Sequence, residues 1–321
     1  MKREECEAEG LIISGIGPKA EMTDRDDGYA DTFVQSLRAR SGHTARSYGH
    51  CIRRFLKSAG KPLDQLTVAD AAGYLASLDG LSPASRAHHI SAVRSFLRFL
   101  QGQGVIPTTP LDILRRPRVA ITSMSRYLTQ EEAERLLEGA RKISWQCHLA
   151  CAVMLLTGLR VSELAQAQWR HLYRDPEGRL GLLVVGKGGR ERVVKVRDDL
   201  FGLLCKGRRR TGLSIDMDAR DTRPLVPSGR GKAYYARTLH KLIAAAAGQA
   251  GLKKPVSPHW LRHSFATAAA LGGAAAFQLQ QDLGHARLET SQRYVHWAVG
   301  LRESAVDHVG IRLDSGGDSL S

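Results

Sequence analysis

The stretch ISWQCHLACAVMLLTGLRVSEL, residues 143–164, joins a long apolar run to an abrupt polar ending. Its first part is almost wholly apolar, which is typical of a helix that is buried on all sides. Gly158 then ends the predicted helix, because glycine accepts the backbone conformation of a helix terminus at little cost. Arg160 follows at the mouth of that helix. A lone arginine there is usually a surface residue, so its role depends on the rest of the chain.

Three later segments carry further cations and one tyrosine: GKGGRER at 186–192, HWLRHSFAT at 259–267 and LGHARLETSQRY at 283–294. Cations around a nucleophile suit phosphoryl transfer, in which negative charge spreads over the non-bridging oxygens. The chain shows no Asp/Glu cluster or HExxH motif for a metal, and arginine is the best substitute because its planar fork binds two phosphate oxygens. The candidate catalytic residues are Arg160, Lys187, His259, Arg262, His285 and Tyr294.

Each of these positions also has a plainer interpretation. A lysine on a glycine turn is usually a solvated charge, and one tyrosine nine residues after a histidine means little alone. His259 and His263 are spaced i, i+4, as in a metal pair, but Trp260 occupies the place where a zinc protease has its glutamate. We expect His263 to face inward and support its helix. Glu163 either forms a salt bridge with Arg160 or faces water.

Taken together, the four segments resemble, position by position, the tyrosine recombinase (integrase) family over roughly residues 127–300. The resemblance implies that Arg160, His259 and Arg262 bind the scissile phosphate, and that Lys187 protonates the departing 5′ oxygen. It makes Tyr294 the nucleophile, whose ordinary pKa of about 10 requires help from the neighbouring cations and histidines, His285 included. Since a phosphotyrosyl bond keeps the energy of the phosphodiester, the resemblance implies that no cofactor, neither metal nor ATP, is needed.

Composition indicates a nucleic-acid partner. The chain has 321 residues, 43% of them apolar, and a net charge of +15. Both ends are acidic, which leaves +21 on residues 29–300. A body this basic favours DNA or RNA over a membrane surface. The chain contains no run of 18 apolar residues, so the sequence predicts no membrane span. The five cysteines form no CxxC pair and indicate reduced thiols in a cytoplasmic protein. We expect this protein to be associated with a prokaryotic nucleoid.

The predicted fold is mainly α with a small β-hairpin at 178–196. We expect an N-terminal four-helix core-binding (SAM-like) domain and an α+β catalytic domain, which the resemblance would close into a C-shaped clamp on duplex DNA. The predicted segments are a disordered acidic tail at 1–28, the core-binding domain at 29–103, a linker at 104–125, the catalytic domain at 126–300, and a tail at 301–321 that is either an inter-subunit arm or a frayed end.

Helix caps and the spacing of apolar residues predict the helices of the N-terminal domain. Helices are predicted at 29–40, at 68–78 after the cap Thr67, and from the cap-then-proline pair at 82–83. A further helix is predicted between the first two, with apolar residues at i, i+3, i+4 and i+7 on one face. Basic residues form a stripe on its opposite face, which favours phosphate contact. The candidate DNA-binding residues are Thr44, Arg46, His50, Arg53, Lys57, Arg94, Arg230 and Lys232.

The predicted activity is site-specific recombination through a 3′-phosphotyrosyl intermediate and a Holliday junction. The predicted partners are duplex DNA bearing a specific site and a homo-tetramer, with or without a second recombinase. Xer-type chromosome-dimer resolution competes with phage integration and with transposon or plasmid resolution. A type IB topoisomerase shares the chemistry without a partner site. A catalytically silent accessory protein and a metal-dependent nuclease are the alternatives from other classes.

Overall fold

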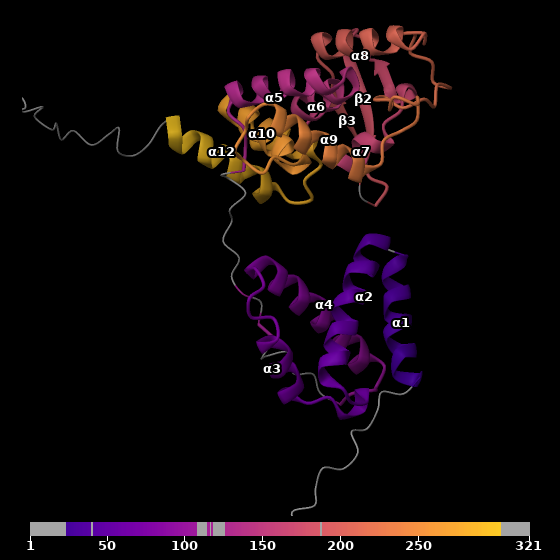
Figure 1. Cartoon of the computed structure of the whole chain (residues 1–321), viewed down its shortest axis with the longest axis vertical. Helices are drawn as coiled ribbons and strands as arrows, with labels where there is room; N and C mark the ends of the chain where they lie inside the picture. The colour runs from indigo at the N-terminus through magenta and orange to yellow at the C-terminus, as the bar shows by residue number, and fades with distance from the viewer. Residues whose placement is uncertain are drawn as a thin grey trace, which may run out of the picture. The chain divides into compact units, whose positions relative to one another are not determined.

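The computed structural model describes residues 24–39, 41–107, 114–115, 117, 126–186 and 188–302. The chain divides into two compact units, Met1–Ala120 and Ile121–Ser321 (Figure 1). In the described ranges, no helix is long and apolar enough to cross a membrane.

The N-terminal unit contains the four helices that the sequence predicts. They are α1 (Asp24–Arg38), α2 (Gly42–Ala59), α3 (Val68–Ala76) and α4 (Pro83–Gly102), with a short 3-10 helix, η1 (Leu63–Gln65), between α2 and α3. α1 begins before the expected residue 29, because the acidic run at its start suits the positive end of the helix dipole. Residues 24–28 are therefore helical rather than disordered, and the rest of the expected acidic tail lies outside the described residues.

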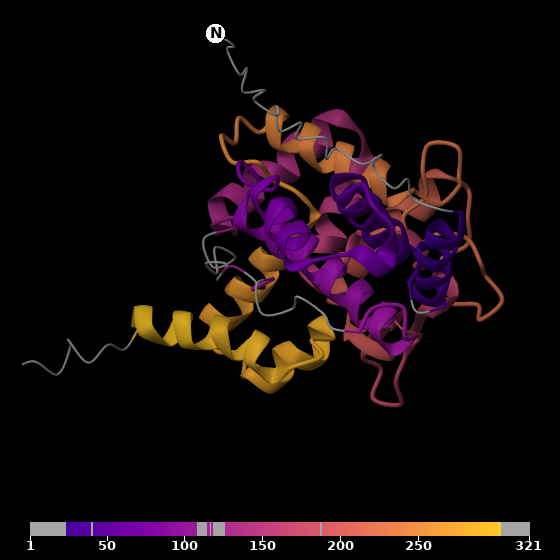
Figure 2. The same cartoon turned by 90° about the horizontal axis from the view of Figure 1, so that it is seen from below.

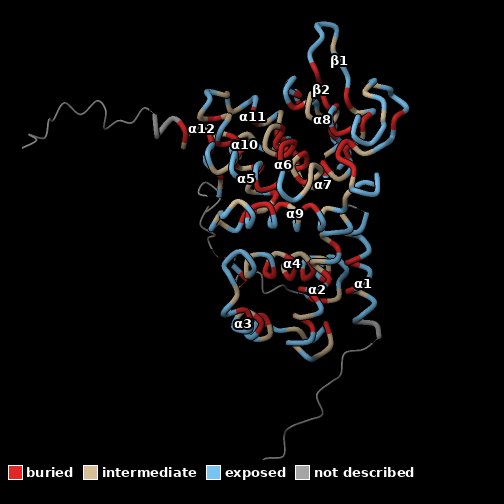
Figure 3. Tube along the Cα trace, turned by 45° about the horizontal axis from the view of Figure 1, so that its top comes forward, coloured by how far each residue is buried: buried red, intermediate tan, exposed pale blue. Residues whose placement is uncertain are grey.

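The helix signals in this unit are confirmed. At the start of α3, the Thr67 hydroxyl accepts a hydrogen bond from the Asp70 amide, and the Asp70 carboxylate accepts one from the Thr67 amide. α4 starts with Ser82 as its cap and Pro83 at its first position. α2 buries Cys51, Ile52 and Phe55. It leaves Arg46, Arg53 and Lys57 exposed, whereas Arg54 is half-buried. Figure 3 shows the buried residues in red along α2 and α4. Each fully buried large apolar side chain stabilises the unit by about 1.5–3 kcal/mol.

The C-terminal unit combines eight helices with one small sheet in its described residues. The helices are α5 (Gln130–Ile143), α6 (Trp145–Thr157), α7 (Val161–Gln166), α8 (Asp198–Arg210), α9 (Ala236–Gln249), α10 (Pro258–Leu271), α11 (Ala276–Leu283) and α12 (Leu288–Arg302), with a 3-10 helix η3 (Trp169–His171). The sheet is antiparallel in the order β1 (Leu172–Arg174), β2 (Leu180–Val185), β3 (Glu191–Lys195). The predicted hairpin is β2–β3, and β1 is a third strand that the sequence did not reveal.

α6 is the central helix of this unit, as its apolar sequence predicts, and it ends where Gly158 adopts φ +63°. A Cβ at Gly158 would lie 2.5 Å from Phe265 Cδ1 and 2.8 Å from Leu283 Cδ2. Only glycine fits between α10 and the end of α11 at this point. The tight contact brings the end of α6 directly against α10, which carries His259 and Arg262, and against Leu283, where the segment LGHARLETSQRY begins.

α10, α11 and α12 form a local cluster at the margin of the unit. α12, in yellow in Figure 2, contacts both α10 and α11. Apolar side chains from all three helices pack together, and Tyr294 of α12 belongs to that buried group. This packing places the histidines and arginine of α10 opposite the tyrosine of α12.

Candidate active site

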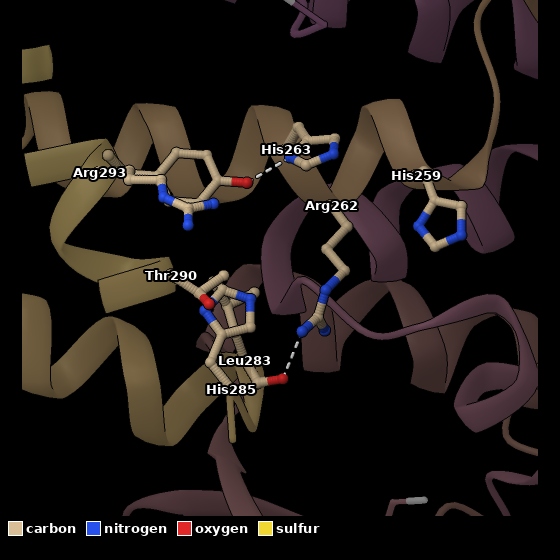
Figure 4. Close-up of a pocket in the computed structure, with 8 residues that line it drawn as sticks. His259, Arg262, His263, Leu283, His285, Thr290 and Arg293 are labelled. Atoms are coloured by element: carbon tan, nitrogen blue, oxygen red, sulfur yellow. Dashed lines mark hydrogen bonds between the residues drawn. The ribbon is translucent and has the colours of Figure 1, made fainter. Parts of the chain in front are cut away.

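A cavity of about 110 Å³ lies where α10, α12 and the loop before α12 meet (Figure 4). All of its lining residues except Leu283 carry polar or charged groups. The lining residues are His259, Arg262, His263, Leu283, His285, Thr290, Arg293 and Tyr294. Four of the six predicted catalytic residues therefore share one cavity.

Arg262 ties the ends of two helices together from inside this cavity. Its Nη1 donates to the carbonyl of Gly158 at 2.6 Å, and its Nη2 donates to the carbonyl of Leu283. Burial and then repulsion from Arg160 lower the pKa of Arg262 to about 9, so it remains a cation at neutral pH. A guanidinium has five N–H donors, so these two bonds leave donors for an anion.

Arg160 lies beside Arg262 at the start of α7. Its Nη1 donates to Glu163 Oε1 at 2.7 Å and its Nη2 donates to the carbonyl of Gly284 at 3.1 Å. The salt bridge with Glu163 is thus formed, rather than the alternative in which Glu163 faces water. About a third of the Arg160 side chain stays exposed, at 32%. This arginine can therefore reach a bound phosphate while its orientation is held by both contacts.

Glu163 also holds a third arginine. Arg192 Nη1 and Nη2 donate to the two carboxylate oxygens at 2.9 and 2.8 Å, and Arg192 Nε donates to the carbonyl of Asp282 at 2.8 Å. Burial alone would raise the pKa of Glu163, but hydrogen bonds from Arg192 and Arg160 lower it to about 2. The carboxylate is therefore ionised at neutral pH and links α7 to β3, while Arg192 itself links β3 to α11.

Tyr294 is buried, with 5% of its surface exposed. Its hydroxyl is hydrogen-bonded to His263 Nδ1 (Figure 4). The ring of His285 lies nearly parallel to the Tyr294 ring, with centroids 6.5 Å apart, and His285 Nδ1 is hydrogen-bonded to the Ser291 hydroxyl at 2.8 Å. Burial raises the pKa of Tyr294, against the opposing effect of Arg262 and Arg293. The phenol is therefore protonated in the protein without DNA.

The three histidines of the cavity are neutral at physiological pH. Burial, and then the charge of neighbouring groups, lower the pKa of His263 and of His285 to about 4. The pKa of His259 is lowered for the same reason, with Arg262 as the next cause. Neutral imidazoles can accept or donate hydrogen bonds, whereas the arginines supply the positive charge.

Comparison with known proteins decides the family. The model of the phage integrase family matches residues 126–299, and that of the phage integrase N-terminal SAM-like domain matches residues 30–104. The chain belongs to the phage integrase family. Tyrosine recombinase XerD of Caulobacter vibrioides is 35% identical over 286 residues, 85% of this chain and 92% of the relative. XerD of Rhizobium meliloti is 30% identical over 295 residues, 86% and 92% of the two chains. The protein is thus a tyrosine recombinase.

Solved structures of integrase-family proteins share the fold. XerH site-specific recombinase bound to palindromic difH substrate, in a post-cleavage complex, has a TM-score of 0.71 at 23% identity, covering 87% of this chain and 83% of that one. A lambda integrase (75–356) dimer bound to a COC′ core site has a TM-score of 0.68 at 19% identity, covering 91% and 99%. The predicted mainly helical architecture with its small sheet is confirmed.

The structure brings together five of the six predicted catalytic residues. His259, Arg262, His285 and Tyr294 line the cavity, and Arg160 joins them through Gly284, next to His285. Lys187, the sixth, lies outside the described residues. His263 differs from expectation: it does not merely support α10 from within but hydrogen-bonds the Tyr294 hydroxyl.

The predicted DNA-binding residues fall into three groups. Arg46, His50, Arg53 and Lys57 are exposed along α2, and Thr44 is half-exposed in its first turn. Arg230 and Lys232 are exposed on the turn that the Pro227–Ala233 bridge closes. Arg94 instead donates to the carbonyl of Leu114 at 3.0 Å and so fastens the chain that follows α4.

The sequence analysis did not single out Arg192. A signal was present, because side chains alternate along a strand and Arg192 shares a face with the buried Val194. An arginine on the core-facing side of a strand requires a buried partner. Its partner Glu163 is 29 residues away in the chain, and only the fold brings them together.

Proposed function

We propose that this protein is a Xer-type site-specific recombinase that cuts and rejoins duplex DNA with Tyr294 as its nucleophile. The observation that carries the proposal is the enclosure of Tyr294 in one cavity with Arg262 and three histidines. The relatives support the Xer type over phage or transposon integration, because XerD proteins match at 35% and 30% identity over most of both chains.

Each predicted catalytic residue has a role in this reaction. Arg160 and Arg262 bind the non-bridging oxygens of the scissile phosphate, where they stabilise the charge that develops in the transition state. His259 and His285 donate further hydrogen bonds to those oxygens. The Tyr294 oxygen attacks phosphorus to leave a 3′-phosphotyrosyl bond, and Lys187 protonates the departing 5′ oxygen. Rejoining by a 5′-hydroxyl reverses the step, so the reaction needs neither ATP nor a metal.

DNA binding uses the basic surfaces of the chain. The exposed residues of α2 and those of the turn at Pro227–Ala233 neutralise backbone phosphates, which positions the duplex without reading its sequence. Among proteins of similar fold, lambda integrase has been solved as a tetramer bound to a Holliday junction. We propose the same assembly here, with two DNA sites, and place the protein on the bacterial chromosome.

Trapping of covalent complexes in host cells tests this function. Cells are lysed in SDS, protein-linked DNA is recovered, and the ends of the linked DNA are sequenced. We expect DNA ends that converge on one sequence, the recombination site, and no linked DNA from the Tyr294→Phe variant. Linked DNA that persists in that variant, or wild-type protein that binds DNA tightly and never links to it, would contradict the proposal.

A further inference from the structure

His263 contacts the reacting atom of the predicted nucleophile, although the family resemblance assigns it no part in the chemistry. It lies on α10 next to Arg262, and its Nδ1 is hydrogen-bonded to the Tyr294 hydroxyl of α12. The two rings are tilted by 36° with centroids 5.9 Å apart, so the contact is made through the polar edges of the rings rather than by stacking.

The other histidines of the cavity are placed differently. The ring of His285 lies nearly parallel to that of Tyr294, and its Nδ1 is hydrogen-bonded to Ser291, which is fully buried. In Figure 4 His259 projects from the far end of the α10 segment, on the other side of Arg262 from His263. Within the part of the chain that the structure describes, His263 is the side chain that hydrogen-bonds the Tyr294 hydroxyl.

We propose that His263 is a further catalytic residue, which accepts the proton of the Tyr294 hydroxyl at Nδ1 as the tyrosyl oxygen attacks the scissile phosphorus. This inference rests on the proposed function. The bond between Tyr294 Oη and phosphorus forms while the bond from phosphorus to the 5′ oxygen breaks. The phenolic proton passes to His263 Nδ1, and the 5′ oxygen takes its proton from Lys187. Rejoining returns both protons.

The surroundings of His263 favour this role. Its charged and titratable neighbours are Arg126 before α5, His259 and Arg262 on α10, Tyr294 on α12, and His285 in the loop before α12. With burial, they keep the imidazole neutral, and only the neutral form has a nitrogen free to accept a proton. A bound phosphate brings negative charge into the same cavity, opposes the effect of the arginines, and so makes proton uptake easier once DNA is in place.

The test compares His263→Asn with wild type. The Oδ1 of asparagine can accept the tyrosine hydrogen bond but cannot take up a proton, so the variant separates positioning from proton transfer. The substrate is a nicked duplex carrying the site found by trapping, and single-turnover formation of the covalent adduct is measured. His296→Asn removes an exposed histidine from the same helix as Tyr294 and serves as the control.

We expect His263→Asn to form adduct about 10²–10⁴-fold more slowly than wild type. A second substrate with sulfur at the departing 5′ position needs no proton at the leaving group. It should restore cleavage by Lys187→Ala and leave the His263→Asn defect unchanged. Cleavage by His263→Asn at the wild-type rate, or its rescue by the sulfur substrate, would overturn the assignment. If wild type forms no adduct at all, the proposed function itself fails.

A measurement on the protein without DNA does not depend on the variant's activity. In protein labelled with ¹⁵N-histidine, two-bond proton–nitrogen correlations distinguish the two neutral tautomers. We expect His263 to carry its proton on Nε2, which leaves Nδ1 as the acceptor. A proton found on Nδ1 would show that His263 donates to Tyr294, and the assignment would be wrong.

Discussion

Glu163 holds two arginines of the site at once, and its side chain is only 3% exposed. Removing its charge leaves Arg160 and Arg192 without their shared partner, and breaking a buried ion pair costs about 3–5 kcal/mol. We therefore expect Glu163→Gln to lower the free energy of unfolding by that amount in urea titrations. Glu138→Gln, an exposed position on α5, should change it by no more than about 0.5 kcal/mol. Equal effects of the two substitutions would contradict this role of Glu163.

Glu163 should also make the free energy of unfolding depend on pH. The pKa of Glu163 is about 2 in the folded protein against an ordinary 4.5, so its ionised form stabilises the fold fully above about pH 4.5. This contribution is lost as the pH falls towards 2, and it amounts to about 3 kcal/mol. Urea titrations between pH 5 and pH 2.5 should show a smaller loss of stability in Glu163→Gln than in wild type. Parallel curves for the two proteins would mean that the carboxylate is not specially stabilised.

At the scale of elements, the end of α6 fixes the site. Gly158→Ala introduces a Cβ into the left-handed conformation and into contact with Phe265 and Leu283. Gly212→Ala meets the same backbone demand, at φ +68°, with no atom within 4 Å. We expect Gly212→Ala to cost about 1–2 kcal/mol, and Gly158→Ala to cost about 1–3 kcal/mol more. Thermal unfolding measures both, and equal melting temperatures would show that the Gly158 contact is not tight.

Elements were predictable where a local signal marks them. The cap Thr67 of α3 and the apolar run of α6 are both local, and both proved correct. β1 was missed because its three residues are too few to show alternation. The start of α1 was missed because its acidic residues also suit a disordered tail. The contacts of Arg192 with Glu163 and of His263 with Tyr294 join residues about thirty positions apart, which no local pattern encodes.

At the scale of the whole molecule, DNA binding should depend on the charge of residues 29–300. Each phosphate contact releases counterions, so affinity falls with salt in proportion to the number of contacts. We expect Arg46→Gln and Lys57→Gln, on the exposed face of α2, each to weaken binding and to reduce the salt slope by about one. Lys142→Gln, an exposed residue at the end of α5, should leave the slope unchanged. Fluorescence titrations at several salt concentrations measure the slopes, and unchanged slopes for the α2 variants would remove α2 from the DNA-binding surface.

The central claim is that Tyr294 becomes covalently joined to DNA. The most direct measurement digests the adduct formed by purified protein on a nicked duplex and identifies the linked peptide and DNA end by mass spectrometry. We predict a peptide containing Tyr294 joined to a 3′-phosphate, formed in the presence of EDTA, and retained by the Tyr235→Phe variant, whose tyrosine is 83% exposed. Linkage at another residue, attachment to a 5′ end, or cleavage that leaves no adduct and stops with EDTA would contradict the account.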